Sequence, residues 1–261
     1  MILYFMIALS ASAVGALAGM GGGVIIKPLC DLIGTYDAQT IGVLSCITVF
    51  SMALVSLAKQ KQQKADFAAD ISFPLSIGSV LGGTIGQRVL ERIAAGLPNA
   101  HVTIVQNVIL SVLVGMIFWY MRHKGSLLTL QMRGILPAAA AGGLLGFLSS
   151  FLGIGGGPIN VALIVFLFSM STKSATVCSS LTIFFAQAAK LVTILFHEGF
   201  GVYDLSALPA MVPGAVLGGF LGAKFNGQLE EKGIERAFNV VQLLVLALCV
   251  MNVFRNLRGG E

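Results

Sequence analysis

Charged residues are scarce in this sequence. Asp, Glu, Lys and Arg make up 10% of its 261 residues, whereas a soluble domain carries about 25%. Hydrophobic residues make up 56%, and the mean hydropathy is +0.92. These proportions exclude a water-soluble globular domain, because too few polar residues remain to cover its surface. We therefore expect an integral membrane protein.

The sequence also lacks the residue sets that carry catalysis or hold metal ions. Its four cysteines are scattered through apolar segments without a CxxC pair, which excludes a disulfide framework and a cysteine metal site. It contains no Ser-His-Asp set, no paired carboxylates and no HExxH motif. We therefore expect no catalytic residues, no metal and no cofactor.

Positive charge is missing from the start of the chain, where no Lys or Arg precedes Lys27. The basic region of a signal peptide is therefore absent, and residues 1–18 are expected to remain in the protein. The net charge of +5 does not indicate a nucleic-acid partner, because Lys and Arg crowd the cytoplasmic loops of membrane proteins. The expected partner is the lipid bilayer.

The sequence contains many long apolar runs. Seven runs have roughly the 20 residues that a membrane helix needs. They cover residues 39–58, 67–86, 102–121, 134–152, 174–196, 204–223 and 236–254. Their number predicts an all-helical protein that crosses the membrane several times.

One glycine-rich pattern occurs twice, as GMGGG at 19–23 and GIGGG at 153–157. Each copy interrupts an apolar stretch and precedes an apolar segment too short to span a bilayer. Unwound backbone at membrane depth is tolerated only where protein or a watery cavity receives its polar groups. Two such interruptions at matching positions of two halves predict the binding site of a transporter.

The glycine pattern is part of an internal duplication. When Gly19 is aligned with Gly153, the register holds without a gap as far as Phe50 and Phe184. Matching positions share Ile25/Ile159, Leu29/Leu163, Val43/Val177, Ser45/Ser179 and Thr48/Thr182. Such duplication is typical of transporter folds. We divide the chain into a first membrane repeat (1–121), a linking loop (122–133) and a second membrane repeat (134–261).

The number of times that each repeat crosses the membrane decides whether the two repeats are parallel or inverted. If each glycine pattern is an ordinary loop, the repeats are parallel and the basic loop residues divide almost evenly between the two sides. If the glycines form the tip of a helical hairpin, the repeats are inverted and the charges divide unevenly. One side then holds Lys59, Lys61, Lys64, Arg122, Lys124, Arg133, Lys173, Lys224, Lys232 and Arg236, and the other holds Arg88, Arg92, Arg255 and Arg258. The positive-inside tendency favours this second arrangement and places both termini outside.

We therefore predict an all-α integral membrane protein with two inverted repeats. Each repeat consists of a glycine-tipped helical hairpin and three transmembrane helices. The hairpin arms are predicted at 1–18, 24–34, 134–152 and 158–168.

The hairpin tips are the predicted binding site. A helix that starts after Gly23 or at Pro158 leaves backbone N–H donors unpaired and presents the positive end of its dipole. Glycine lets an anion approach these donors closely. We expect both tips to meet and hold one small anion; the alternative is that the glycines only permit tight packing. The tip residues assigned to substrate are Gly21, Gly22, Gly23, Val24, Gly155, Gly156 and Gly157.

Hydroxyl side chains recur on the helices that follow the hairpins. They are Ser45, Thr48, Ser179, Ser180 and Thr182. A spacing of three places each Ser/Thr pair on one helix face. Two interpretations remain open: donation to an anion, or hydrogen bonding between helices and to the preceding turn.

A few polar side chains interrupt the apolar segments near the tips. Lys27 lies one turn beyond the first tip, and a lysine within a membrane is a functional candidate. The matching position, Val161, is apolar, and the neighbouring Asn160 is a weaker donor. Gln187 and Lys190 share a helix face; the alternative for Lys190 is that it extends to the following loop.

Two further sets of glycines are spaced by four residues. They are Gly78, Gly82 and Gly86 in the first repeat and Gly214, Gly218 and Gly222 in the second. Small residues at this spacing allow helices to pack closely. These faces suit a homodimer as readily as the fold of one chain.

Residues 19–28 (GMGGGVIIKP) and 153–160 (GIGGGPIN), each followed by a helix with Ser and Thr, resemble the TauE/SafE sulfite exporter family. The same family is called the 4-toluene sulfonate uptake permease family (TSUP). The resemblance covers essentially the whole chain. Residues 42–45 (GVLS) depart from the family's usual Gly-Thr-Ser. This departure bears on which of the family's substrates the protein transports.

The resemblance implies a multi-pass transporter of a prokaryotic plasma membrane. Its substrates would be sulfur-containing anions such as sulfite, sulfoacetate or another organosulfonate, and it suggests proton coupling, which no residue here demonstrates. We expect a secondary transporter that works by alternating access and is not an enzyme. The alternatives are a passive anion channel and a membrane enzyme of sulfur metabolism, which the missing catalytic residues disfavour.

Overall fold

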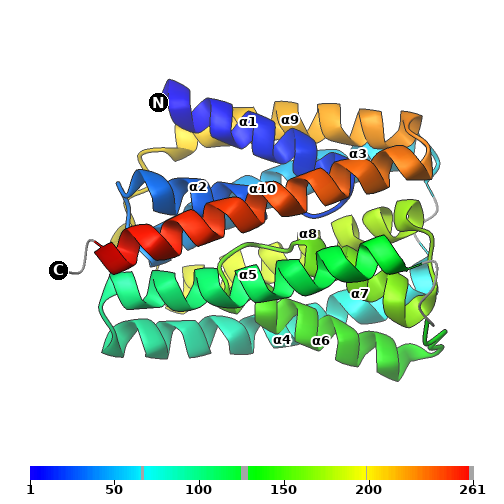
Figure 1. Ribbon diagram of the computed structural model, residues 1–261, viewed down its shortest axis with the longest axis horizontal. Coiled ribbons are helices and arrows are strands. Elements are labelled where there is room, and N and C mark those ends of the chain that lie inside the picture. Colours follow the sequence, from blue (N-terminus) through cyan, green and yellow to red (C-terminus); the bar gives the residue numbers. More distant parts are fainter. Residues whose placement is uncertain (66–67, 125–128, 198, 259–261) are drawn as a thin grey trace.

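The computed structural model describes residues 1–65, 68–124, 129–197 and 199–258. Within them the chain is helical and contains no strand, as predicted (Figure 1). The first half contains α1 (Ile2–Ala18), α2 (Gly23–Ile33), α3 (Ala38–Gln62), α4 (Ala69–Gly96) and α5 (Asn99–His123). The second half contains α6 (Ile135–Phe151), α7 (Pro158–Phe168), α8 (Thr172–His197), the short 3-10 helix η1 (Phe200–Val202), α9 (Leu208–Gln228) and α10 (Glu231–Arg258). Residues 125–128 of the predicted linking loop lie outside the described residues.

Five helices are long and apolar enough to cross a membrane, which indicates a multi-pass membrane protein. They are α3, α5 from Ala100, α8 to Phe196, α9, and α10 to Leu257. The 28-residue helix α4 is not among them. Serine and glycine fill much of its middle, so it has fewer large apolar side chains than the other long helices.

Short helices and glycine turns form two hairpins at the predicted positions. We call residues 19–23 the first tip and residues 153–157 the second tip. Each tip starts with a glycine at φ 67°, Gly19 or Gly153, and Gly156 adopts φ 118°. These left-handed conformations strain residues that carry a Cβ atom, which explains the glycine content of both patterns.

The hairpins enter the molecule from opposite ends. Figure 1 shows α2 near the end that holds both chain termini and α7 near the other end. The hairpin arrangement and the alternative of four spans per repeat both place the two termini on one side, so this feature does not distinguish them. The inverted relation of the two repeats in the membrane stays a prediction.

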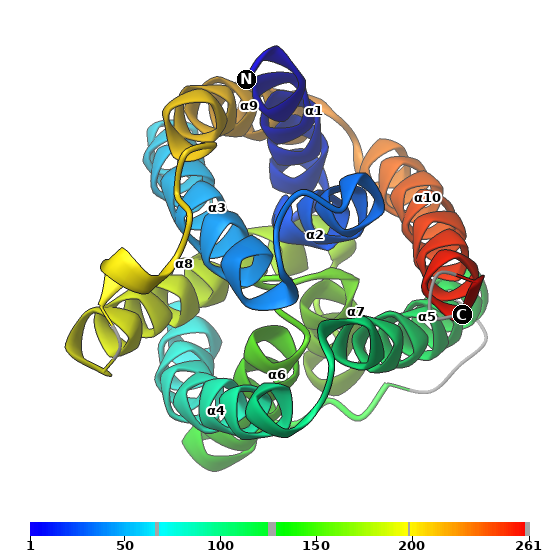
Figure 2. The same cartoon turned by 90° about the vertical axis from the view of Figure 1, so that its left-hand side faces the viewer.

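The spaced glycines join each hairpin to the opposite half of the chain. A Cβ atom placed on Gly82 of α4 would lie 1.8 Å from the carbonyl oxygen of Gly143 on α6. One placed on Gly218 of α9 would lie 2.4 Å from the carbonyl oxygen of Leu9 on α1. Figure 2 shows the two resulting pairs, α4 beside α6 and α9 beside α1. These glycines therefore serve packing within the chain, and their use in a homodimer stays a prediction.

The short second arms of the hairpins lie in the interior. Figure 2 shows α2 with α1, α3 and α10 around it. Val24 and Ile26 of α2, and Val161 and Ile164 of α7, are fully buried in the main hydrophobic core. The rest of the molecule therefore holds both tips in place.

Candidate functional site

The two glycine tips contact each other. A Cβ atom placed on Gly23 would lie 1.9 Å from the carbonyl oxygen of Ile154. One placed on Gly21 would lie 3.4 Å from the carbonyl oxygen of Gly155. Only glycine allows the first approach, because a methyl group there would overlap the backbone of the second tip. The expectation that the tips meet is therefore met by the geometry of the backbone.

Backbone N–H groups at both tips are left without partners. Six of these N–H groups donate no hydrogen bond to any atom of the described residues. They belong to Gly21, Gly22, Gly23, Gly155, Gly156 and Gly157. All six residues are buried. Buried N–H groups are nearly always paired, so a cluster of unpaired donors is typical of a place that receives a ligand or water.

Ser45 of α3 lies directly against the first tip. Its Oγ atom is 2.7 Å from the position that a Cβ atom of Gly23 would occupy. The side chain is fully buried, and its hydroxyl has no hydrogen-bond partner among the described residues. An unpaired buried hydroxyl costs folding free energy, so its retention favours a role toward a ligand.

Gln187 of α8 lies against the second tip. Its Cδ and Oε1 atoms are each 3.2 Å from the Cβ position of Gly155. The side chain is 1% exposed, and Oε1 has no partner in the described part of the chain. Cys46 of α3 donates through Sγ to the Gln187 carbonyl oxygen at 3.7 Å, which links the two helices beside the tips.

The other predicted hydroxyls are used inside the protein. Thr48, Ser180 and Thr182 each donate to the carbonyl oxygen one turn earlier, at 2.7, 2.9 and 3.1 Å. Ser179 donates to the carbonyl oxygen of Gly19 at 2.7 Å and so supports the first tip. Of the five hydroxyls, Ser45 alone has no partner among the residues described here.

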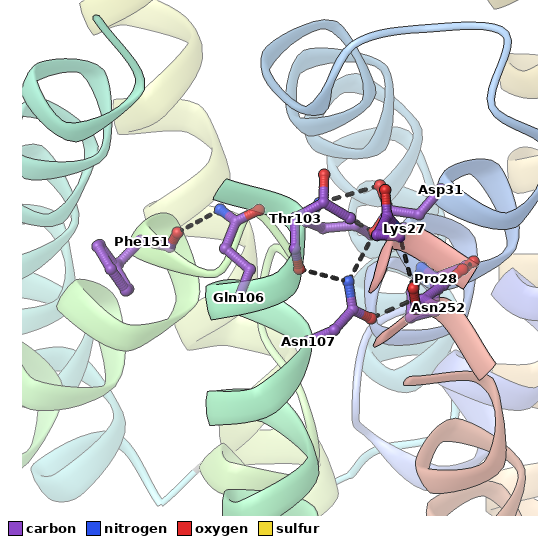
Figure 3. Close-up of polar contacts among 9 residues, drawn as sticks. Lys27, Pro28, Asp31, Thr103, Gln106, Asn107, Phe151 and Asn252 are labelled. Atoms are coloured by element: carbon purple, nitrogen blue, oxygen red, sulfur yellow. Dashed lines mark hydrogen bonds and ion pairs between the residues drawn. The ribbon is translucent and has the colours of Figure 1, made fainter. Parts of the chain in front are cut away.

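Lys27 forms a buried ion pair on α2. Its Nζ lies 3.2 Å from both carboxylate oxygens of Asp31, and the two side chains are 2% and 1% exposed. Figure 3 shows the pair between Asn107 of α5, which donates to Asp31 at 3.2 Å, and Asn252 of α10, which donates to the Pro28 carbonyl oxygen at 2.8 Å. The spacing of four between Lys27 and Asp31 is the sequence signal for this pair. The two asparagines carry no such signal.

Lys190 of α8 is buried near the same place, at 5% exposure. Its ammonium therefore does not extend to the following loop. Nζ lies 3.9 Å from the Cβ position of Gly42 on α3, and the Cα of Gly42 lies 3.8 Å from the Cβ position of Gly153. The Cδ and Cε atoms of Lys27 are 3.3 Å from that same Gly153 position. Both lysines thus lie beside the second tip.

Val24 and Asn160, the remaining predicted site residues, occupy the first turns of α2 and α7. Val24 is fully buried and Asn160 is 4% exposed. No side-chain hydrogen bond of Asn160 occurs with any described residue. Both residues lie next to the tips, but neither provides an observed contact that distinguishes binding from packing.

Polar cavities lie at the two ends of α3, on either side of the tips. One, of about 300 Å³, is lined at the start of α3 by Asp31, Tyr36, Thr103 and Arg255, among others. The other, of about 290 Å³, is lined at the end of α3 by Gln60, Gln63, Lys173 and Asn226, among others. Ser45, which lies against the first tip, falls between the two cavities along the helix.

Comparisons with known proteins relate the whole chain to one family. The family model described as Sulfite exporter TauE/SafE matches residues 4–249. "Probable membrane transporter protein YunE" of Bacillus subtilis (strain 168) is 27% identical over 269 residues, which cover 94% of this chain and 95% of that protein.

A second relative, "Probable membrane transporter protein MamO" of Magnetospirillum gryphiswaldense, is 27% identical over 255 residues. The match covers 84% of this chain but 40% of that protein. No solved structure matches the chain. The family model spans the ten α-helices of the described residues, the first and the last in part, and both glycine tips. The chain therefore belongs to the TauE/SafE sulfite exporter family.

Proposed function

We propose that this protein, a membrane transporter by its family, is a secondary transporter of small sulfur-containing anions. The substrate is sulfite, sulfoacetate or another organosulfonate, and it binds between the two glycine tips. The sulfur chemistry comes from the description of the family. The proposed location is the plasma membrane of a prokaryote, and the protein leaves its substrate chemically unchanged.

The observation that carries the proposal is the set of unpaired donors at the contact between the tips. Six buried backbone N–H groups lack partners within the described chain, and the hydroxyl of Ser45 is unpaired beside them. The Gln187 amide lies at the second tip. Backbone N–H groups at helix starts are a recurrent means of binding anions, and the helix dipole adds to the attraction.

Alternating access is supported by the position of the tips between two polar cavities. One cavity lies at the start of α3 and the other at its end, and Ser45, which contacts the first tip, lies between them along the helix. A carrier exposes such a site to one side at a time by moving one set of helices against another. The close glycine contacts of α4 with α6 and of α1 with α9 are surfaces along which such movement can occur.

The test is the thermal stability of the purified protein against a panel of sulfite, sulfoacetate, taurine, thiosulfate, sulfate, chloride and acetate. A ligand that binds the native state at 100 times its Kd stabilises it by about 2.7 kcal/mol. We expect stabilisation by at least one sulfur anion and none by acetate. Stabilisation by an unrelated solute alone would contradict the proposed substrate class.

The matched variants are Ser45→Ala and Ser51→Ala, both on α3. Ser51 donates to the Ile47 carbonyl oxygen at 2.9 Å, away from the tips. Ser45→Ala removes the unpaired hydroxyl and is expected to weaken anion binding by about tenfold, which corresponds to about 1.4 kcal/mol. Ser51→Ala is expected to leave binding unchanged. Equal effects of the two changes would argue against the site.

Uptake into proteoliposomes separates a carrier from a channel. A carrier shows saturable uptake and exchanges labelled for unlabelled anion, whereas a passive channel gives a conductance that does not depend on exchange. A pH gradient across the same vesicles tests proton coupling. Recovery of the anion in altered chemical form would instead indicate an enzyme.

A further inference from the structure

Three charged side chains are buried around the tips, and the charges of two of them neutralise each other. Lys27 and Asp31 form an ion pair at 3.2 Å, and Asn107 donates to the same carboxylate. This pair contributes no net charge beside the second tip. The third charged side chain is Lys190, for which the sequence left two interpretations open, a functional role or extension to the following loop.

Lys190 has no ion-pair or hydrogen-bond partner among the described residues. The acidic group whose charge reaches it is Glu91 on α4, which lies beyond ion-pair distance and accepts a hydrogen bond from Gln87 at 2.8 Å. A buried ammonium without a counter-ion is strongly unfavourable in a low-dielectric interior. Such a group either loses its proton or takes a negative charge from outside the chain, and the unpaired donors at the neighbouring tips favour the second.

The surroundings of Lys190 indicate where that charge binds. Gln187 lies one turn earlier on the same face of α8, and its Nε2 atom, the amide donor, is 3.3 Å from the Cβ position of Gly155 at the second tip. Gly42 of α3 lies against the ammonium, and the absence of a side chain there leaves room between Lys190 and the second tip. Ser45, with its unpaired hydroxyl, follows Gly42 by one turn.

We propose that Lys190 is the cation of the anion site and that the site accepts a singly charged anion. This inference rests on the proposed function and narrows its substrate class. One negative charge neutralises Lys190 and leaves the buried site uncharged. A doubly charged anion leaves one uncompensated negative charge in the same apolar surroundings. Hydrogen sulfite and simple organosulfonates are therefore favoured over sulfate, thiosulfate and sulfoacetate, each of which carries two charges.

The experiment compares methanesulfonate with sulfate, two tetrahedral sulfur anions that differ in charge. Binding is measured by titration of the purified full-length protein at neutral pH. The wild type is expected to prefer methanesulfonate. Lys190→Met should weaken methanesulfonate binding on the order of 30-fold or more, because it removes one partner of a buried charge pair.

Asp31→Asn tests the charge count independently. It removes the carboxylate that neutralises Lys27, so the site gains a second positive charge. The preference is expected to shift toward sulfate by about tenfold or more, an effect of at least 1.4 kcal/mol. The matched control is Glu230→Gln, which removes an exposed carboxylate between α9 and α10 and should leave the preference unchanged.

The outcomes separate this inference from the proposed function. A wild type that binds neither these two anions nor any sulfur compound of the thermal-stability panel contradicts the proposed function itself. A wild type that prefers sulfate, or a Lys190→Met variant that keeps its methanesulfonate affinity, overturns only the assignment of Lys190. An Asp31→Asn variant with an unchanged preference overturns the charge count.

Discussion

At the scale of single residues, Gly23 is the position where the contact between the tips is closest. A Cβ atom there would lie 1.9 Å from the Ile154 carbonyl oxygen, and backbone cannot move aside as a flexible side chain can. Gly23→Ala is therefore expected to lower the free energy of unfolding by about 3 kcal/mol, the upper part of the usual range for overpacking. The measurement is thermal unfolding of the purified variant in detergent.

The control for this change is Gly115→Ala in the interior of α5. A Cβ atom on Gly115 has no neighbour within 4 Å, so the substitution brings only the higher helix propensity of alanine. We expect an unchanged or slightly higher melting temperature. If both alanine variants melted alike, the close contact at Gly23 would be refuted.

Residue roles could be predicted from the sequence only where local spacing determines them. Ser45 and Ser179 occupy matching positions of the repeat, yet one is unpaired and the other donates to Gly19. The difference arises from neighbouring helices of the opposite half, which sequence spacing does not reveal. Lys27 was expected near the tips and lies beside the second tip, where it is paired with Asp31. Asp31 also accepts a hydrogen bond from Asn107 of α5, which is distant in the sequence.

At the scale of helices, the glycines of α4 are expected to control how closely α4 approaches α6. Gly82→Ala would place a methyl group 1.8 Å from the Gly143 carbonyl oxygen and should separate the two helices. We expect a loss of stability of about 1–3 kcal/mol and reduced anion uptake, because α6 carries the second tip. Melting temperature and uptake are measured on the same preparations.

The same interface offers a matched substitution in Gly143→Ala. Its Cβ atom would meet the nearest atom, the Gly78 carbonyl oxygen, at 3.8 Å, which is an ordinary contact. This variant is expected to melt and transport like the wild type. Greater damage from Gly143→Ala than from Gly82→Ala would show that the helices pack differently.

Helix bounds could be predicted well, and helix partners could not. The predicted hairpin arms agree with α1, α2, α6 and α7 to within a few residues, because glycine and proline mark the interruptions locally. The spaced glycines predicted close packing, but not that α4 of the first half packs on α6 of the second, and α9 of the second half on α1 of the first. This pairing depends on which helix surfaces meet once both halves have folded. Sequence periodicity carries no information about such a choice.

At the scale of the whole molecule, charge distinguishes the two ends. Ten of the loop Lys and Arg residues belong to the end where α3 and α5 finish and α8 and α10 begin, and four belong to the end that holds the termini. At the first end, Lys124 contacts Glu235 and lies 3.8 Å from Glu231, so α10 is tied to the segment after α5. Basic residues concentrate on the cytoplasmic side of membrane proteins. We therefore expect the termini to face outward.

Cysteine labelling in whole cells tests this orientation. All four native cysteines are buried, so they contribute little background. Gly201→Cys lies at the end with the termini, where a Cβ atom has no neighbour within 4 Å, and Lys232→Cys is exposed at the opposite end. A membrane-impermeant maleimide should label Gly201→Cys in intact cells and Lys232→Cys only after permeabilisation. The reverse pattern would place the termini inside and contradict the positive-inside argument. Labelling of both in intact cells would show that these positions do not lie on opposite sides of the membrane, and would refute the hairpin arrangement.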